Sequence, residues 1–414
     1  MYLRGSKWSM RKSSRKSRKR FWQILFLLVL IGGAVYVERV IVPTIPAPFI
    51  PTPTPTRSPA SYVLEAESLF EAGKLDQAEE AYQQAIMVQP DEAEFYIALA
   101  RVQVFNGNLE EAELNARNAL LLAPDSSDAH GVLGWILDFQ GGDALVESEE
   151  SVEKALNLNP NSALAHAYHA EVLMDLGEYE TALEEARTAV QLDPNLLEAQ
   201  RALGYVWENT ANYENALDAY LSALRINPNL TMLHLSAGDM YLALFDAENA
   251  RESYLRAVAL SPNDPTPLTR IMLVYARDGE YGIASQYAAD AALKNPSNAT
   301  LHGNLGRMYY KNSDYESAIE SLALAIHGGV TETGEEVEGI PLDPGSPVVI
   351  EFYSTYGLAL AKTARCDLAT QIFEALLIGV PDDEVAIFNA TEGLRICTEI
   401  ETGTPQPTLT TPPE

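Results

Sequence analysis

Small apolar residues recur along this chain at intervals of 34 residues, with a single interval of 36. Two such series are Ala78, Ala112, Ser148, Ala182, Ala216, Ala250, Ala284 and Ala318, and Ala85, Ala119, Ala155, Ala189, Ala223, Ala257, Ala291 and Ala325. Larger apolar residues recur in another register, as Leu99, Leu133, Leu203, Ile271 and Leu305. Since small residues let two helices approach closely and large ones fill the groove between them, the pattern predicts pairs of antiparallel helices.

A proline follows each predicted helix pair. Pro90, Pro124, Pro160, Pro194, Pro228, Pro262 and Pro296 are separated by 34, 36, 34, 34, 34 and 34 residues. Proline ends one helix and is tolerated in the first turn of the next. An Asn or Asp follows each of the first six prolines and supplies turn and capping chemistry. A fixed period of this length predicts a stacked array in which each unit packs only on its neighbours.

This pattern resembles the tetratricopeptide repeat. In the first unit, residues 59–92, the matching positions are Tyr62, Ala66, Gly73, Ala78, Tyr82, Ala85 and Pro90. The resemblance implies an all-α fold, a right-handed superhelix (solenoid) of about nine antiparallel helix hairpins. Eight units fit residues 59–332, and a ninth with a capping helix fits residues 350–400. The third unit carries two extra residues near Gly141, and the eighth lacks its closing proline.

An acidic insertion, residues 333–349, separates the eighth and ninth units. Thr333 and Gly334 favour a short hairpin turn there. Loops of this kind often carry function, yet a long surface loop costs little free energy. The insertion is therefore either a functional loop or a tolerated surface insertion.

Residues 21–37 contain no charged side chain. A helix of this length rises about 26 Å, at the lower end of what spans a bilayer. Nine of the ten Lys and Arg among residues 1–40 precede the stretch, so we expect residues 1–20 in the cytoplasm and the remainder outside it. This predicts a single-pass cell-membrane protein. A cleaved signal peptide is the alternative, although no convincing cleavage site follows.

Two segments rich in Pro and Thr flank the repeats. Residues 42–58 contain six prolines and predict either an extended spacer of roughly 50 Å or a linker whose length is unimportant. The tail, residues 401–414, has a similar composition, and we expect it to be disordered.

The charge of the chain is distributed unevenly. The formal net charge is -30, but residues 41–414 hold 18 basic and 57 acidic residues and therefore carry -39. A body of this charge repels phosphates, which argues against nucleic acid as a partner. It favours a basic protein or peptide.

The chain lacks the common catalytic and phosphate-binding motifs. It contains no G-x-x-x-x-G-K-[ST], G-x-S-x-G or H-E-x-x-H, so we predict no enzymatic activity, cofactor or metal site. His130, His166, His234 and His302 occupy the same position of successive units, which indicates a structural role. His166 and His169 share one helix face but have no convincing third ligand.

The chain has two cysteines, Cys366 and Cys397. In the repeat frame both lie beside a hairpin turn, where consecutive units stack. An extracytoplasmic compartment permits disulfides, so we predict a bond between them. Free structural thiols are the alternative.

The resemblance also implies a binding surface, because positions 2, 5, 9 and 12 of each first helix line the concave face in this family. These positions include Arg101, Trp135, Arg201, Tyr205, Asp239, Arg307 and Tyr310. Arginine and aromatic side chains are favoured at interface hot spots, so we predict a protein-binding groove there; ordinary solvent-exposed surface is the alternative. The function predicted is a membrane-anchored scaffold. A structural spacer or self-assembling element, and a non-catalytic subunit of an envelope enzyme for cell-wall or polysaccharide assembly, remain open.

Overall fold

The structure is a computed structural model that describes residues 17–41 and 57–403. It falls into two units, which divide between Arg57 and Ser58. In the first unit, α1 (Ser17–Tyr36) continues into the five-residue π-helix η1 (Val37–Ile41). Most of the predicted basic segment, of the Pro/Thr-rich linker and of the C-terminal tail lies outside the described residues.

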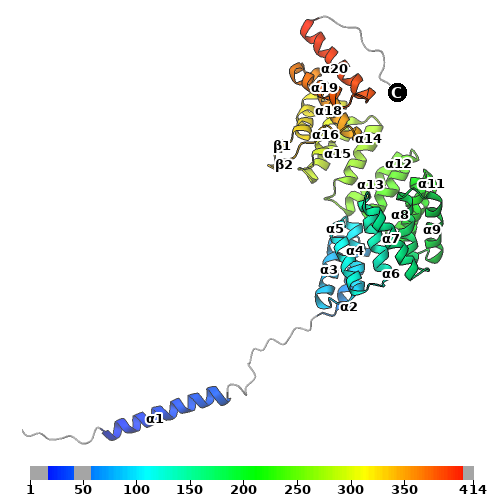
Figure 1. Cartoon of the computed structure of the whole chain (residues 1–414). Coiled ribbons are helices and arrows are strands. Elements are labelled where there is room, and N and C mark those ends of the chain that lie inside the picture. The colour runs from blue at the N-terminus through cyan, green and yellow to red at the C-terminus, as the bar shows by residue number, and fades with distance from the viewer. Residues whose placement is uncertain (1–16, 42–56, 404–414) are drawn as a thin grey trace, which may run out of the picture. The chain divides into compact units, whose positions relative to one another are not determined.

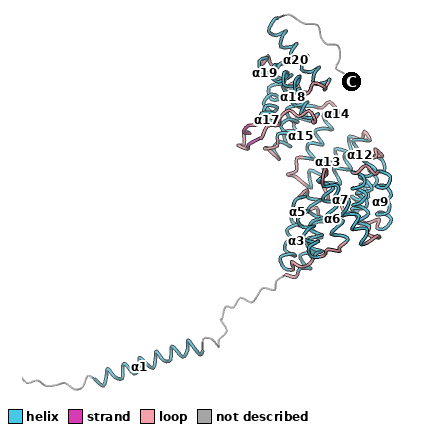
Figure 2. Tube along the Cα trace, in the orientation of Figure 1, coloured by secondary structure: helices cyan, strands magenta, loops and turns pink. Residues whose placement is uncertain are grey.

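The second unit consists of nine helix hairpins followed by one further helix, over the described residues 58–403 (Figures 1 and 2). The first helices of the hairpins are α2 (Pro59–Glu71), α4 (Ala93–Asn106), α6 (Ser127–Gln140), α8 (Ala163–Asp175), α10 (Leu197–Asn209), α12 (Thr231–Ala243), α14 (Thr266–Arg277), α16 (Ala299–Lys311) and α18 (Pro347–Lys362). The second helices are α3 (Leu75–Val88), α5 (Leu109–Leu122), α7 (Ala144–Leu158), α9 (Tyr179–Leu192), α11 (Tyr213–Ile226), α13 (Ala247–Leu260), α15 (Tyr281–Lys294), α17 (Tyr315–His327) and α19 (Cys366–Gly379). The last helix is α20 (Glu384–Thr402). The predicted all-helical repeat array is confirmed.

The recurring small residues lie in the packed interior of the array. Every alanine of the two series is buried; Ser148 is buried too and donates a hydrogen bond to the carbonyl of Gly134. A Cβ atom on Gly238 would lie 2.4 Å from the ring of Tyr254. Since real Cβ contacts are longer, glycine is required there for the two helices to pack at this distance.

The histidines that share one repeat position have a structural role, as predicted. The Nε2 atoms of His130, His166, His234 and His302 lie 2.8–3.0 Å from the carbonyl oxygens of Pro124, Pro160, Pro228 and Pro296. Gln200 and Tyr96 make the same contact in their own repeats. The side chain at this position therefore satisfies a carbonyl left open at the end of the preceding hairpin.

The short hairpin suggested by Thr333 and Gly334 is present, and its first strand precedes the predicted bounds of the insertion. Strands β1 (Gly329–Val330) and β2 (Glu336–Val337) pair antiparallel, with Gly329 opposite Val337. Gly334 has a φ of 89°, which glycine adopts without strain. Helix α18 begins at Pro347, because proline fits the first turn of a helix, and so starts within the predicted insertion.

The first six hairpins form a closed turn, which we define as residues 59–260. Helix α8 packs directly on both α6 and α10, and the loop between α11 and α12 meets the first hairpin. The side chains of Asn227 and Asn229 donate hydrogen bonds to the carbonyls of Phe70 (3.2 Å) and Glu71 (2.8 Å). The sequence pattern alone did not predict this closure. Helices α14 to α20 follow it and form the open half, residues 266–402 (Figure 1).

Candidate protein-binding surface

The seven predicted groove residues all lie on first helices of hairpins, but in different surroundings. The closed turn brings together Arg101, Trp135, Arg201 and Tyr205. Asp239 lies on α12, beside the place where the turn closes. Arg307 and Tyr310 lie on α16, in the open half.

Trp135 is completely buried inside the closed turn. Its ring stacks on that of Tyr168, with centroids 4.7 Å apart, and contacts the rings of Phe105 and Phe139. Its Nε1 donates a hydrogen bond of 3.0 Å to Glu171. In this arrangement Trp135 belongs to the core of the turn, and a partner cannot reach it.

Two ion pairs fill the rest of this interior. Arg201 pairs with Glu171, and both side chains are buried. Arg101 on α4 pairs with Glu198 on α10 at 2.5 Å, and Glu198 has no exposed surface. Burial and the Arg201 pair act in opposite directions on the pKa of Glu171, which is raised overall. The Arg101 pair links the second hairpin to the fifth and so helps to hold the turn closed.

Asp138 is a third carboxyl group in the same interior. Burial raises its pKa to about 8, and the nearby Asp175 and Glu171 also act to raise it. At neutral pH it is therefore mostly protonated, and it adds little negative charge beside the two ion pairs. Tyr205 lies at the edge of this cluster and donates a hydrogen bond to Asp175.

Sequence reasoning identified the arginines of this cluster but missed their carboxylate partners. Glu171, Glu198 and Asp138 occupy positions 9, 2 and 12 of their first helices, which are groove positions. Acidic residues at groove positions, alongside the arginines Arg101 and Arg201, were the available signal, because opposite charges on one concave face can pair across it.

Asp239 lines a cavity of about 630 Å³. It accepts a hydrogen bond of 2.6 Å from Tyr254, and an ion pair of 3.4 Å joins it to Arg270 on α14. The other walls are the turn between α2 and α3, the end of α4, and the loop between α13 and α14. This cavity therefore lies between the first two hairpins and the sixth and seventh.

Arg307 and Tyr310 lie on α16 and are both partly exposed. Arg307 pairs with Glu351 on α18 at 2.6 Å and lies over the ring of Phe352. Tyr310 is half-buried and packs against Tyr315, with ring centroids 5.5 Å apart. Protein binding by these groove residues stays a prediction, and neither Arg307 nor Tyr310 is buried, in contrast to Trp135 and Arg201.

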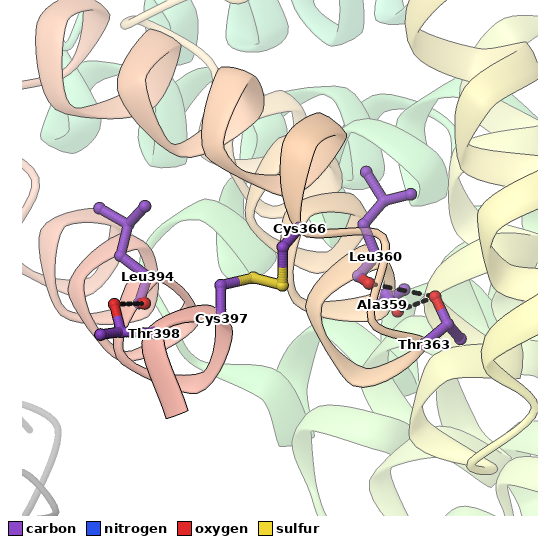
Figure 3. Close-up of a disulfide and its surroundings, with 7 residues drawn as sticks. All are labelled: Ala359, Leu360, Thr363, Cys366, Leu394, Cys397 and Thr398. Carbon is purple, nitrogen blue, oxygen red and sulfur yellow. Dashed lines mark hydrogen bonds between the residues drawn. A yellow bond between two sulfur atoms is a disulfide. The ribbon is translucent and has the colours of Figure 1, made fainter. Parts of the chain in front are cut away.

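The structure contains the predicted disulfide between Cys366 and Cys397 (Figure 3). Cys366 is the first residue of α19 and Cys397 lies in α20, and their Cα atoms are 5.4 Å apart. Both residues are buried. The bond therefore attaches the last helix to the ninth hairpin.

His166 and His169 both lie near Glu185 on α9. Burial alone would raise the pKa of Glu185, but hydrogen bonds from the two histidines lower it to about 2. Over residues 17–41 and 57–403 the structure holds no group of three or more His, Cys, Asp or Glu arranged to hold a metal ion.

Among the described residues one helix is long and apolar enough to cross a membrane. It covers Phe21–Arg39 and has a mean hydropathy of 1.9. A signal sequence near the N-terminus has the same properties. The segment is thus a candidate membrane span or signal.

Models of the tetratricopeptide repeat match most of the array. They match residues 69–137, then 145–197, 168–231 and 271–329, and finally 233–264. Among solved structures, a thermophilic tetratricopeptide repeat protein from Thermus thermophilus has 23% sequence identity and a TM-score of 0.38. The likeness covers 45% of this chain and 100% of that one, and it is too weak to support an argument. No curated protein matches this chain. Since the family models together cover more than half of its residues, the chain belongs to the tetratricopeptide repeat proteins.

Proposed function

We propose that this protein is a membrane-anchored scaffold whose repeat array binds a protein or peptide outside the cytoplasm. The observation that carries the proposal is the array itself, with nine hairpins and no described metal cluster. Arrays of this kind present extended surfaces to partners. We further propose that the hairpins wind as a right-handed superhelix.

Three features support the location. The apolar segment Phe21–Arg39 follows nine basic residues, as in helices whose N-terminal side stays in the cytoplasm. The Pro/Thr-rich segment 42–58 separates this segment from the repeats in the sequence, and its composition is that of a linker. The disulfide between Cys366 and Cys397 is typical of proteins in oxidising compartments.

Topology is tested on intact cells. Cells are treated with a maleimide of about 5 kDa before and after reduction, and the mass of the protein is read on a gel. We expect no labelling without reductant and two labels after it. Two labels without reductant would contradict the disulfide. No labelling of intact cells after reduction, when the same reagent labels both cysteines in a denatured lysate, would contradict the extracytoplasmic location.

Partner binding is tested by affinity purification of the full chain from detergent-solubilised membranes after cross-linking. The candidate partner is then purified and mixed with the full chain, and the mixture is separated by size-exclusion chromatography. A complex of fixed stoichiometry supports the scaffold. The variant that tests the predicted groove is Arg307→Ala with Tyr310→Ala. Trp135 and Arg201 are not replaced, because both are buried and their removal would disturb folding. The absence of any stoichiometric complex would contradict the proposal.

Self-assembly is a second candidate, favoured by apolar residues at the C-terminal end of the array. Leu368, Ile378, Val385 and Ile400 are about half to four-fifths exposed on α19 and α20. Sedimentation velocity of the full chain in detergent at several concentrations tests it. A concentration-dependent increase that Ile378→Glu abolishes supports self-assembly, and a constant monomer contradicts it.

A further inference from the structure

The concave face of the closed turn has one place that its own side chains do not fill. Trp135, Arg201 and Glu171 occupy the middle of the turn. The cavity of about 630 Å³ lies where the first and sixth hairpins meet. Its volume is within the range of about 300–1,000 Å³ that is usual for ligand sites.

The closing contacts give this cavity its walls. Asn227 and Asn229 bind the carbonyls of Phe70 and Glu71, just before the turn that forms one wall. Gly73 is part of this wall, and a Cβ atom there would lie 2.2 Å from the carbonyl oxygen of Asn229. The site therefore exists only because the turn closes.

The lining combines an apolar surface with an excess of acidic groups. Met232, Leu235 and Phe105 are among its apolar members. Its charged members are Lys74, Asp76, Asp239, Asp264 and Arg270, of which Arg270 is already paired with Asp239. Asp76 accepts a hydrogen bond from Asn106 and Asp264 accepts one from the backbone of Thr266, and neither is in an ion pair among the described residues.

We propose that this cavity binds an extended segment of a basic polypeptide. One Lys or Arg side chain lies near Asp76 and Asp264, and an adjacent apolar side chain packs on Met232 and Leu235. The charge of -39 over residues 41–414 attracts such a segment from a distance. The inference rests on the proposed scaffold function and specifies where, and for which chemistry, the scaffold binds.

The probe is a library of random ten-residue peptides in which every position can be any amino acid except cysteine. Peptides that bind the full chain in detergent micelles are selected from it. Enriched peptides are sequenced, and their affinity is measured by fluorescence anisotropy at low and high salt. We expect enrichment of a Lys or Arg next to an apolar residue, with affinity that falls as salt rises. Enrichment of peptides without basic residues would overturn the proposal.

Two variants with matched controls locate the site. Ser236→Phe fills the cavity, and its control is Ser253→Phe on α13, which does not line it. The double change Asp76→Asn and Asp264→Asn removes charge and keeps the accepting oxygens. Its control is Asp193→Asn with Asp218→Asn. Asp193, like Asp264, accepts a hydrogen bond from the backbone N–H two residues later, and Asp218 is exposed.

We expect Ser236→Phe to weaken peptide binding at least about tenfold by exclusion of the ligand. The two removed charges should weaken it about three- to tenfold, as partly exposed ion pairs do. Both controls should bind like the unchanged protein. Circular dichroism establishes that each variant is folded.

Each other outcome is decisive. If Ser236→Phe binds normally and Arg307→Ala with Tyr310→Ala does not, the site is wrong but the scaffold function stands. If no peptide is enriched while a folded partner forms a stoichiometric complex, the peptide site is wrong and the scaffold again stands. If neither a peptide nor a protein binds, both proposals fail.

Discussion

The closed turn and the open half are built from the same repeat but use their concave faces differently. In the closed turn, Trp135 is buried and Arg201 and Glu171 form an internal ion pair. In the open half, Arg307 also pairs with a carboxylate, Glu351, but about two-fifths of the Glu351 side chain is exposed. A concave face can thus serve as a core or as a surface, and the curvature of the array decides which.

The largest difference in stability between the two halves is expected when the arginine of each ion pair, Arg201 or Arg307, is replaced by alanine. Arg201→Ala leaves Glu171 buried without its partner, which typically costs about 3–5 kcal/mol. Arg307→Ala should cost about 1 kcal/mol or less, because Glu351 stays hydrated. Urea unfolding followed by circular dichroism measures both. Equal losses in the two variants would show that the two faces do not differ in burial.

The disulfide should stabilise only the end of the open half. Replacing Cys366 and Cys397 by serine removes a bond between residues 31 positions apart, which should cost on the order of 3 kcal/mol. Hydrogen exchange should become faster in α19 and α20 and stay unchanged in α6 to α10. Faster exchange throughout the array would contradict the local role of the bond.

Gly73 and Gly107 occupy the same position in the first and second hairpins. Comparing an alanine substitution at each position tests whether the turn is closed at Gly73. Gly73 and Gly107 have φ values of 72° and 82°, so alanine is strained by roughly 1–2 kcal/mol at either position. A Cβ atom on Gly73 also meets the backbone of Asn229, whereas one on Gly107 meets nothing within 4 Å. We expect Gly73→Ala to lose about 2 kcal/mol more than Gly107→Ala in thermal unfolding. Equal losses would mean that the turn is open in solution.

The smallest expected effect is a pH dependence confined to the closed turn. The pKa of Asp138 is about 8 in the folded state and is raised from an ordinary value of 3.8. Its protonated form is favoured by folding, so the stability it contributes is complete below about pH 4 and is lost as the pH rises from there through 8. Between about pH 7 and pH 9 the remaining loss should be about 1.4 kcal/mol.

Asp138→Asn should remove this part of the pH dependence, because asparagine does not titrate. The control is Asp218→Asn, which replaces an exposed carboxylate on α11. Urea unfolding at pH 7, 8 and 9 gives the slope for each protein. A slope in Asp138→Asn as steep as that of the unchanged chain would assign the effect to another group.

The hairpins were predictable from the sequence because their determinants are local. The alanines, the prolines and the histidine position each act within one hairpin or between neighbours, as the contact between His130 and Pro124 shows. The cysteine pair was predictable for the same reason, since the ninth hairpin and α20 are adjacent in the chain. The tetratricopeptide pattern is therefore sufficient to predict the structure of the single hairpin.

The closed turn was not predictable in this way. Asn227 and Phe70 meet only because the small rotations between five successive hairpins add up, and no local pattern fixes that sum. For the same reason the sequence did not indicate that Trp135 is buried, whereas Tyr310, at position 12 of the eighth unit, is only half-buried.

The most direct test of the account is the accessibility of Trp135 in solution. In the full chain, Trp8, Trp22 and Trp207 are replaced by phenylalanine, and acrylamide quenching of the remaining tryptophan is measured. The comparison protein carries Trp135→Phe and Tyr310→Trp in the same background. The closed turn predicts blue-shifted emission and quenching of Trp135 about tenfold slower than that of the tryptophan at position 310. Equally fast quenching at both positions in folded protein would contradict a closed, self-filled first turn.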